Sequence, residues 1–156
     1  MEIRKSERTL QARCENGATL ELAAAMGRVP LGHKLIAGDQ RTPEGTYRIS
    51  GPAETSRFHA FVPIDYPSVR DADAALADGR IDVSDYARIV GAHERGEPPP
   101  ADTPLGGDIG LHGEGDRWAG DSQHLDWTLG CVALTDTDLD YLIERIEPGV
   151  TVEIRP

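Results

Sequence analysis

The sequence is poor in cysteine, in aromatic residues and in long apolar runs, and each shortage excludes a class of protein. Only two of the 156 residues are cysteines, which is too few for a disulfide-stapled scaffold. No apolar run approaches the roughly 20 residues that cross a bilayer, so no membrane span is expected. Aromatic residues make up 5% and hydrophobic residues 38%, which still allows one core in a chain of this length.

Basic residues are also scarce relative to acidic ones. The chain carries 16 Lys and Arg against 27 Asp and Glu, for a formal net charge of −11. Because phosphate backbones are bound by clustered Lys and Arg, nucleic acid is not an expected partner. Residues 1–5 lead directly into a strand-like segment rather than an apolar stretch, so this sequence shows no signal peptide.

Alternating apolar residues predict β-structure at both ends of the chain. Apolar residues alternate along the first segment, at Leu10, Ala12 and Cys14, so they lie on one face of a strand. Turn-forming residues follow at 15–17, and a second strand-like segment follows at 19–22, which is the pattern of a hairpin with one buried face. In this pattern Cys14 packs as a small apolar residue. Further strands are expected on the approach to position 112 and at 46–50, 58–64 and 150–154.

Helical patterns occupy the middle and the C-terminal part. The ranges 71–78 and 84–95 have helical composition, and the prolines at 98–100 end it. Thr135 can cap a later helix whose apolar stripe comprises Leu139, Leu142, Ile143 and Ile146. With no repeat and no linker, we predict one mainly β domain over 1–156, with a few helices and a helical, proline-rich insertion around 70–104.

The residues with catalytic potential lie between 109 and 134. His112 ends an apolar run and precedes Gly113, and Cys131 follows Gly130 nineteen residues later. A cysteine beside a histidine can lose its proton near neutral pH, and the thiolate attacks carbonyl carbon. Gly130 permits a close backbone approach, so that neighbouring amides can face a developing oxyanion. Together, these residues predict a cysteine acyl-transfer enzyme that needs no cofactor.

Two other readings of these residues stay open. His112, His124, Asp126 and Cys131 are all metal-ligand types, but they lack the short paired spacing that makes zinc motifs specific, so no metal is predicted. A disulfide between Cys14 and Cys131 would remove the nucleophile.

The order and spacing of several segments resemble the L,D-transpeptidase catalytic domain of the YkuD family. In particular, they resemble the branch whose cysteine motif reads Asp-Trp-Thr-x-Gly-Cys. The resemblance covers nearly the whole chain and rests on residues 32–34, 38–39, 41–47, 66–67, 105–107, 111–113 and 126–133. It implies a YkuD-like β-sandwich with a cradle that opens on the cysteine.

The resemblance also implies roles for individual residues. Cys131 would attack the amide after the third residue of a peptidoglycan stem peptide, and His112 would be the base. The Gly113 carbonyl would orient the histidine, and the amides of Gly130 and Cys131 would hold the oxyanion. Substrate contacts would come from the following residues: Thr128, Asp126, Tyr66 and His59. For Asp126 a loop-cap role, and for His59 a structural role, are the alternatives.

The acceptor of the acyl group stays open at this point. It is an amine of a second stem peptide, a lipoprotein or a D-amino acid in a transpeptidase, and water in an L,D-carboxypeptidase or amidase. The commoner motif has Ser, His and Arg where this chain has Thr128, Leu129 and Ala133, which changes how an acidic peptide is held. A non-catalytic cell-wall binding module is a further alternative. The resemblance implies a periplasmic or cell-envelope location, and the cytoplasm is the alternative.

Overall fold

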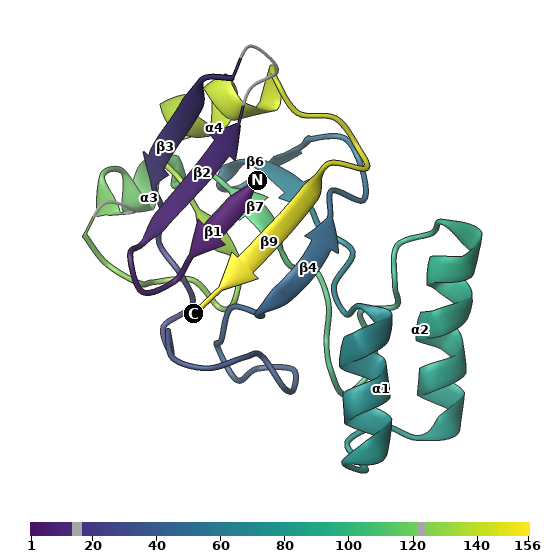
Figure 1. Ribbon diagram of the computed structural model, residues 1–156. Coiled ribbons are helices and arrows are strands. Elements are labelled where there is room, and N and C mark those ends of the chain that lie inside the picture. The colour runs from purple at the N-terminus through teal and green to yellow at the C-terminus, as the bar shows by residue number, and fades with distance from the viewer. Residues whose placement is uncertain (14–16, 122–123) are drawn as a thin grey trace.

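The computed structural model describes residues 1–13, 17–121 and 124–156, which form two mixed β-sheets accompanied by helices (Figure 1). The elements are β1 (Glu2–Arg4), β2 (Thr9–Arg13), β3 (Thr19–Ala23), β4 (Gly45–Arg48), β5 (Glu54–Ser56), β6 (His59–Pro63), α1 (Val69–Ala77), α2 (Val83–Arg95), β7 (Gly110–His112), α3 (Gly115–Trp118), β8 (Val132–Ala133), α4 (Asp136–Ile143) and β9 (Thr151–Arg155). Cys14 and the predicted turn after it lie outside the described residues. None of the helices in the described ranges has the length and apolar character that a membrane crossing requires.

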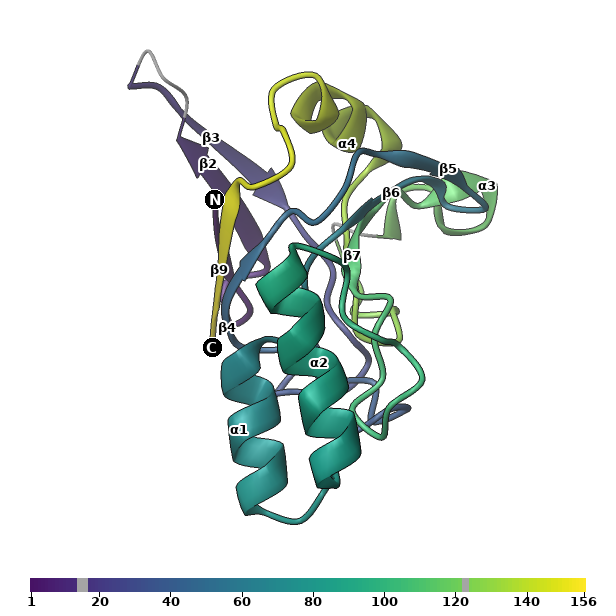
Figure 2. The ribbon, with the colours of Figure 1, turned by 90° about the vertical axis from the view of Figure 1, so that its right-hand side faces the viewer.

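The two sheets form two layers. The first has the order β3-β2-β1-β9-β4, with β1 and β9 parallel and the other neighbours antiparallel. The second has the order β5-β6-β7-β8, with β7 and β8 parallel. Figure 2 shows the first sheet on the left and the strands β6 and β7 to its right. The predicted mainly β fold is confirmed.

The main core lies between the sheets and uses the alternation seen in the sequence. Leu10 faces Leu22 across the antiparallel pair of β2 and β3, and both are buried. The buried face continues through Ile154 of β9, while Val62 and Leu111 reach the same core from the second sheet. Burying such side chains stabilises the fold by about 1.5–3 kcal/mol each.

The helices α1 and α2 form a hairpin that projects from the sheets (Figure 1). The side chains of Ser68 and Asp82 cap their N-termini, and α2 ends at Gly96 in a left-handed conformation. The hairpin has a small core of its own that includes Ala72, Ala75, Ile81, Ile89 and Leu105. Both predicted helices are confirmed, with their ends shifted by two residues or fewer.

The C-terminal helix α4 begins as predicted but ends early. The Thr135 hydroxyl accepts a backbone amide of the first turn, and Leu139 and Leu142 are buried in the main core. The helix stops one residue after Leu142, where the Arg145 amide makes a tighter bond to the Leu142 carbonyl. Ile146 therefore lies beyond the helix, and the predicted stripe is too long by one position.

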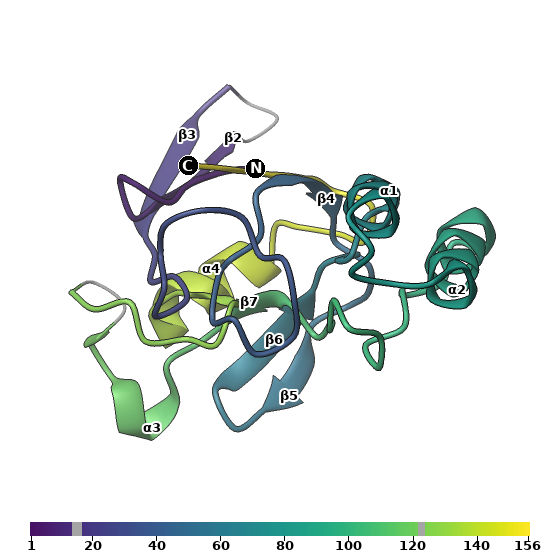
Figure 3. The ribbon, with the colours of Figure 1, turned by 90° about the horizontal axis from the view of Figure 1, so that it is seen from below.

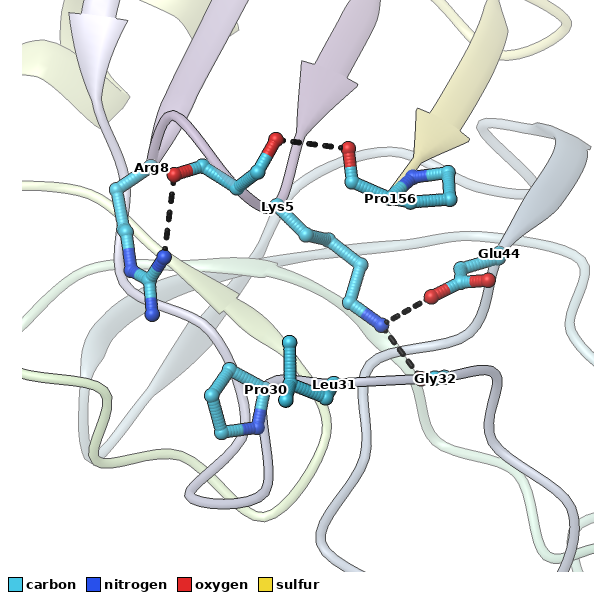
Figure 4. Close-up of a pocket in the computed structure, with 8 residues that line it drawn as sticks. Lys5, Arg8, Pro30, Leu31, Gly32, Glu44 and Pro156 are labelled. Carbon is cyan, nitrogen blue, oxygen red and sulfur yellow. Dashed lines mark hydrogen bonds and ion pairs between the residues drawn. The ribbon is translucent and has the colours of Figure 1, made fainter.

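The segment between β3 and β4 is fixed to the first sheet by a buried lysine. The Lys5 ammonium donates to the Glu44 carboxylate at 2.8 Å and to the Gly32 carbonyl at 2.6 Å (Figure 4). It also donates to the Thr42 carbonyl at 3.0 Å. Three partners match its three donors, which allows a charged group to be buried there. Seen from below, the segment passes in front of β7 (Figure 3). Ala25 in this segment pairs with Ala133 of β8.

Candidate active site

The fold brings His112 and Cys131 to neighbouring strands of the second sheet. His112 is the last residue of β7, and Cys131 immediately precedes β8. The two strands run parallel, and their register sets His112 opposite Ala133, two residues beyond Cys131. Parallel pairing therefore brings together the candidate base and the candidate nucleophile, which are nineteen residues apart in the sequence.

The imidazole of His112 is held in one tautomer. Its Nδ1 lies 2.6 Å from the Gly113 carbonyl oxygen, and because a carbonyl only accepts, Nδ1 carries the proton. The side chain is buried, and burial lowers its pKa; Arg57 lowers the pKa further, whereas the Gly113 carbonyl opposes the change. His112 is therefore neutral at pH 7, with the lone pair on Nε2 available as a base.

Aromatic rings enclose this histidine. Phe58 stacks on it with ring centroids 4.8 Å apart, and the edge of Trp127 meets it at 5.3 Å. Trp118 stacks in turn on Trp127 at 4.8 Å. These rings exclude water from the imidazole, which is the physical cause of its lowered pKa. Neither Phe58 nor Trp118 was expected from the sequence. The position of Trp118 between His112 and Cys131 was a signal, whereas nothing near Phe58 in the sequence marks it.

The thiol of Cys131 is protonated at rest. Cys131 is a free cysteine, and its Sγ donates a hydrogen bond to the Asp108 carbonyl at 3.4 Å. Burial raises the pKa of the Cys131 thiol to about 11, and Asp108 adds to this rise, whereas the Gly110 backbone and Lys34 oppose it. The neutral form therefore predominates over the whole physiological range of pH.

The contacts of the two groups do not join the thiol to the imidazole. The thiol hydrogen bond goes to Asp108 and the imidazole hydrogen bond goes to Gly113, so neither of them joins the two groups. Desolvation disfavours both charged forms, which raises the pKa of the thiol and lowers that of the imidazole. The resting pair is a neutral acid beside a neutral base.

Thr128 braces the turn that carries the nucleophile. Its buried hydroxyl donates to the Cys131 carbonyl at 2.6 Å and accepts from the Gly130 amide at 3.1 Å. This geometry revises two expectations, because the hydroxyl faces the backbone rather than a substrate and the Gly130 amide is already engaged. The Cys131 amide is then the better candidate for an oxyanion donor.

Replacing Thr128 tests this brace. We expect Thr128→Val to lower the free energy of unfolding by about 1–3 kcal/mol, because the Gly130 amide loses its buried acceptor. Thr128→Ser keeps the hydroxyl and should recover most of that loss. Urea denaturation of the three proteins provides the measurement, and equal stability of the valine and serine variants would contradict the brace.

The two glycines of the site allow close packing. A Cβ at Gly130 would lie 2.9 Å from the Arg41 carbonyl, and this glycine has φ of 139°. A Cβ at Gly113 would lie 2.3 Å from Asp136 Oδ1 and 2.7 Å from the Phe58 carbonyl. Gly113 therefore makes room for the start of α4 and for the backbone at Phe58.

A substitution at Gly113 should consequently destabilise the fold. We expect Gly113→Ala to cost at least about 1–3 kcal/mol, because the methyl group has rigid backbone on one side. Gly91→Ala in α2 is the matched control, since its methyl group meets only the flexible end of Arg95. This control should be neutral or stabilising by about 0.5–1 kcal/mol. Thermal denaturation measures the melting temperatures of the two variants, and a Gly113→Ala protein more stable than Gly91→Ala would refute the packing argument.

Asp136 has a second role that the sequence did not reveal. It is an acidic residue in the first turn of α4, and its Oδ1 also accepts the amides of Glu114 at 2.8 Å and Gly115 at 3.1 Å. These bonds tie the turn after His112 to the start of α4. The Gly113 carbonyl that orients the imidazole lies inside this turn.

The other expected substrate residues make contacts within the protein. Asp126 Oδ1 accepts the Met26 amide at 2.9 Å, and its Oδ2 pairs with Arg8 at 2.8 Å, so the carboxylate caps the loop before the nucleophile. Tyr66 is buried, with its hydroxyl 3.4 Å from the Leu105 carbonyl. His59 is exposed and pairs with Asp140 of α4 at 2.7 Å, which raises its pKa. The structure thus brings none of these three side chains into a hydrogen bond with His112 or Cys131.

Metal-ligand side chains do not gather around the thiol. Across residues 1–13, 17–121 and 124–156, no three His, Cys, Asp or Glu side chains are grouped so that they could hold a metal ion. Asp126 in particular is occupied by Met26 and Arg8. The described site contains a thiol, an imidazole and backbone amides, which are the groups that covalent acyl transfer requires.

Residues 1–154 match the family model of the YkuD L,D-transpeptidase catalytic domain, so the chain belongs to this family. No curated protein sequence matches the chain. Among solved structures, an L,D-transpeptidase from Mycobacterium smegmatis superposes with a TM-score of 0.56 at 12% identity, covering 99% of this chain and 57% of that one. One from Stackebrandtia nassauensis gives 0.51 at 16%, with coverages of 99% and 55%. The L,D-transpeptidase LdtMt1 in complex with imipenem gives 0.52 at 15%, with coverages of 98% and 56%.

These likenesses concern the fold. The chain spans little more than half the length of the solved transpeptidases that it matches, at 55–57% of each. Their sequences differ from this one at more than four positions in five. The substrate, the acceptor and the roles of individual residues are therefore argued from the site itself.

Proposed function

We propose that the protein is a cysteine acyltransferase that acts on peptidoglycan stem peptides. The observation that carries this proposal is the fixed tautomer of His112 on the strand beside Cys131. An Nδ1 proton held by the Gly113 carbonyl leaves Nε2 as the only basic nitrogen of the ring. Membership of the L,D-transpeptidase family supplies the substrate class.

In the first step, Cys131 turns from the Asp108 carbonyl toward His112. Nε2 takes the Sγ proton while Sγ forms a bond to the peptide carbonyl carbon, and the Cys131 amide stabilises the resulting oxyanion. The tetrahedral species collapses by breaking the C–N bond. The imidazolium returns its proton to the leaving amine, and a thioester on Cys131 remains.

In the second step, an acceptor attacks the thioester. Its nitrogen or oxygen forms the new bond to the carbonyl carbon, Nε2 of His112 takes the proton of the acceptor, and the thiolate leaves and is reprotonated. An amine acceptor makes the protein an L,D-transpeptidase, which is the activity we propose. Water as acceptor would make it an L,D-carboxypeptidase or an amidase. We place the reaction in the cell envelope, where the substrate is found.

The raised pKa of the thiol predicts how Cys131 reacts with simple electrophiles. In a Cys14→Ala protein, the alkylation rate of Cys131 by iodoacetamide should rise roughly tenfold per pH unit from neutral pH toward about pH 11. Only the thiolate reacts, and its fraction grows in this way below the pKa. A plateau that begins below pH 8 would show a preformed thiolate and would contradict the neutral resting pair.

Mass spectrometry of muropeptides distinguishes the possible activities. Purified protein is incubated with tetrapeptide muropeptides, with and without an added D-amino acid as the amine acceptor. We expect loss of the terminal D-alanine with gain of the added residue. Loss of D-alanine alone identifies a hydrolase, and an unchanged profile that persists with every acceptor supports a non-catalytic binding module instead.

A further inference from the structure

A cavity lies beside the loop that leads to Cys131, and its lining includes His124, Leu125 and Asp126 of that loop. Its volume is about 390 Å³, its floor is formed by Ala24 and Ala25, and its wall includes Arg8, Arg28 and Asp126. Ala25 links it to the candidate active site, because Ala25 pairs with Ala133 and packs in one cluster with Trp127. The ring of Trp127 in turn contacts the imidazole of His112, as described above.

The charges around this cavity are opposite in sign to those of the chain as a whole. The protein carries a net charge of −11, yet two arginines and one aspartate surround the floor. Arg8 is neutralised by its ion pair with Asp126 at 2.8 Å. Arg28 has no carboxylate within 4.0 Å among the residues that the structure describes, so one positive charge remains uncompensated.

The guanidinium of Arg28 is also oriented. Its Nε donates to the Trp127 carbonyl at 3.2 Å, and its backbone amide donates to the Thr128 carbonyl at 3.0 Å. These bonds fix the arginine against the loop that carries Cys131. Arg28 is exposed, and no described residue forms a hydrogen bond with the two terminal nitrogens of its planar fork. This geometry suits two parallel hydrogen bonds to a carboxylate.

We infer that Arg28 forms the anchor of a subsite for a carboxylate of the peptide substrate, in the cavity floored by Ala24 and Ala25. This inference rests on the proposed function, because it takes the substrate to be a stem peptide. A stem peptide offers two kinds of carboxylate, one at its C-terminus and others on its side chains. Both have the same chemistry, and the experiment separates them.

The test measures binding without turnover. Isothermal titration of the Cys131→Ala protein uses a tetrapeptide that ends in D-alanine, its C-terminal amide and its side-chain amide. We expect Arg28→Gln to weaken binding of the free tetrapeptide about tenfold and Arg28→Lys to weaken it less. Added salt should narrow the difference between arginine and glutamine, since screening weakens a charge pair. Arg95→Gln, which alters an exposed arginine on α2 that pairs with Glu97, is the matched control.

The amides identify the carboxylate. If one of the amidated tetrapeptides binds equally well with arginine and with glutamine at position 28, the carboxylate missing from that peptide is the one that Arg28 binds. Unchanged binding of the free tetrapeptide to Arg28→Gln, with the melting temperature also unchanged, overturns the subsite and leaves the proposed function intact. If no peptide binds to any variant and the protein with Cys131 intact forms no adduct with a carbapenem, the proposed function and the subsite fall together.

Discussion

Replacing Cys131 by alanine should abolish the formation of any new muropeptide, with a loss of at least about a thousandfold in rate. The substitution removes the sulfur that forms the thioester and leaves no other nucleophile at the end of the loop. Because Cys131 is only partly buried and packs against the main core rather than belonging to it, its loss should change stability little. The measurement is the rate of product formation by mass spectrometry.

The chain contains a matched control for this experiment. It has two cysteines, and Cys14→Ala removes the other one. The Cys14 variant should keep its full rate, whereas a protein that lacks Cys131 should show none. Equal residual activity in the two variants would assign the chemistry to a group other than Cys131.

Replacing His112 by glutamine should lower kcat/KM by about 10²–10⁴-fold, the usual contribution of a general base. The thiol has a pKa of about 11 and depends on this base at neutral pH. Glutamine can still donate to the Gly113 carbonyl, but it offers no basic nitrogen to the thiol. His93→Gln on α2 is the control, since that histidine contacts the Pro67 carbonyl and should leave the rate unchanged.

The pH profile of the unmodified protein also tests the assignment of His112 as the base, because it shows on which side of the profile activity falls. Burial lowers the pKa of His112 below its ordinary value of 6.5, so the base is neutral and competent above that pKa. Activity should therefore fall only on the acid side, below pH 6.5, and this limb should vanish in His112→Gln. A profile in which the acid limb survives the substitution would show that another group titrates.

The strands and helices could be predicted from the sequence because they follow simple periodicities. The alternation through Leu10 and Ala12 specifies the β2–β3 hairpin, and the Thr135 cap with Leu139 and Leu142 specifies α4. The end of α4 could not be read in this way. A tighter turn after Leu142 ends the helix, although Ile146 continues the apolar pattern.

The order of motifs indicated His112 and Cys131, but the electrostatics of the pair depend on packing. Phe58 lies far from both residues in the sequence, and although Trp118 lies between them, no local pattern reveals that rings enclose the imidazole. Their exclusion of water lowers the pKa of His112, whereas the raised pKa of the thiol comes from the surroundings of Cys131 itself. The same limit applies to Thr128, since the direction in which its hydroxyl points is set by the turn around it.

The most direct test of the central claim is the intact mass of the protein after exposure to a carbapenem. The L,D-transpeptidase LdtMt1 has been solved in complex with imipenem, which is a carbapenem. We predict a single covalent adduct that maps to the peptide containing Cys131, forms in Cys14→Ala and fails to form in Cys131→Ala. An unmodified mass, or an adduct on a residue other than Cys131, would contradict the assignment of Cys131 as the acyl-accepting nucleophile.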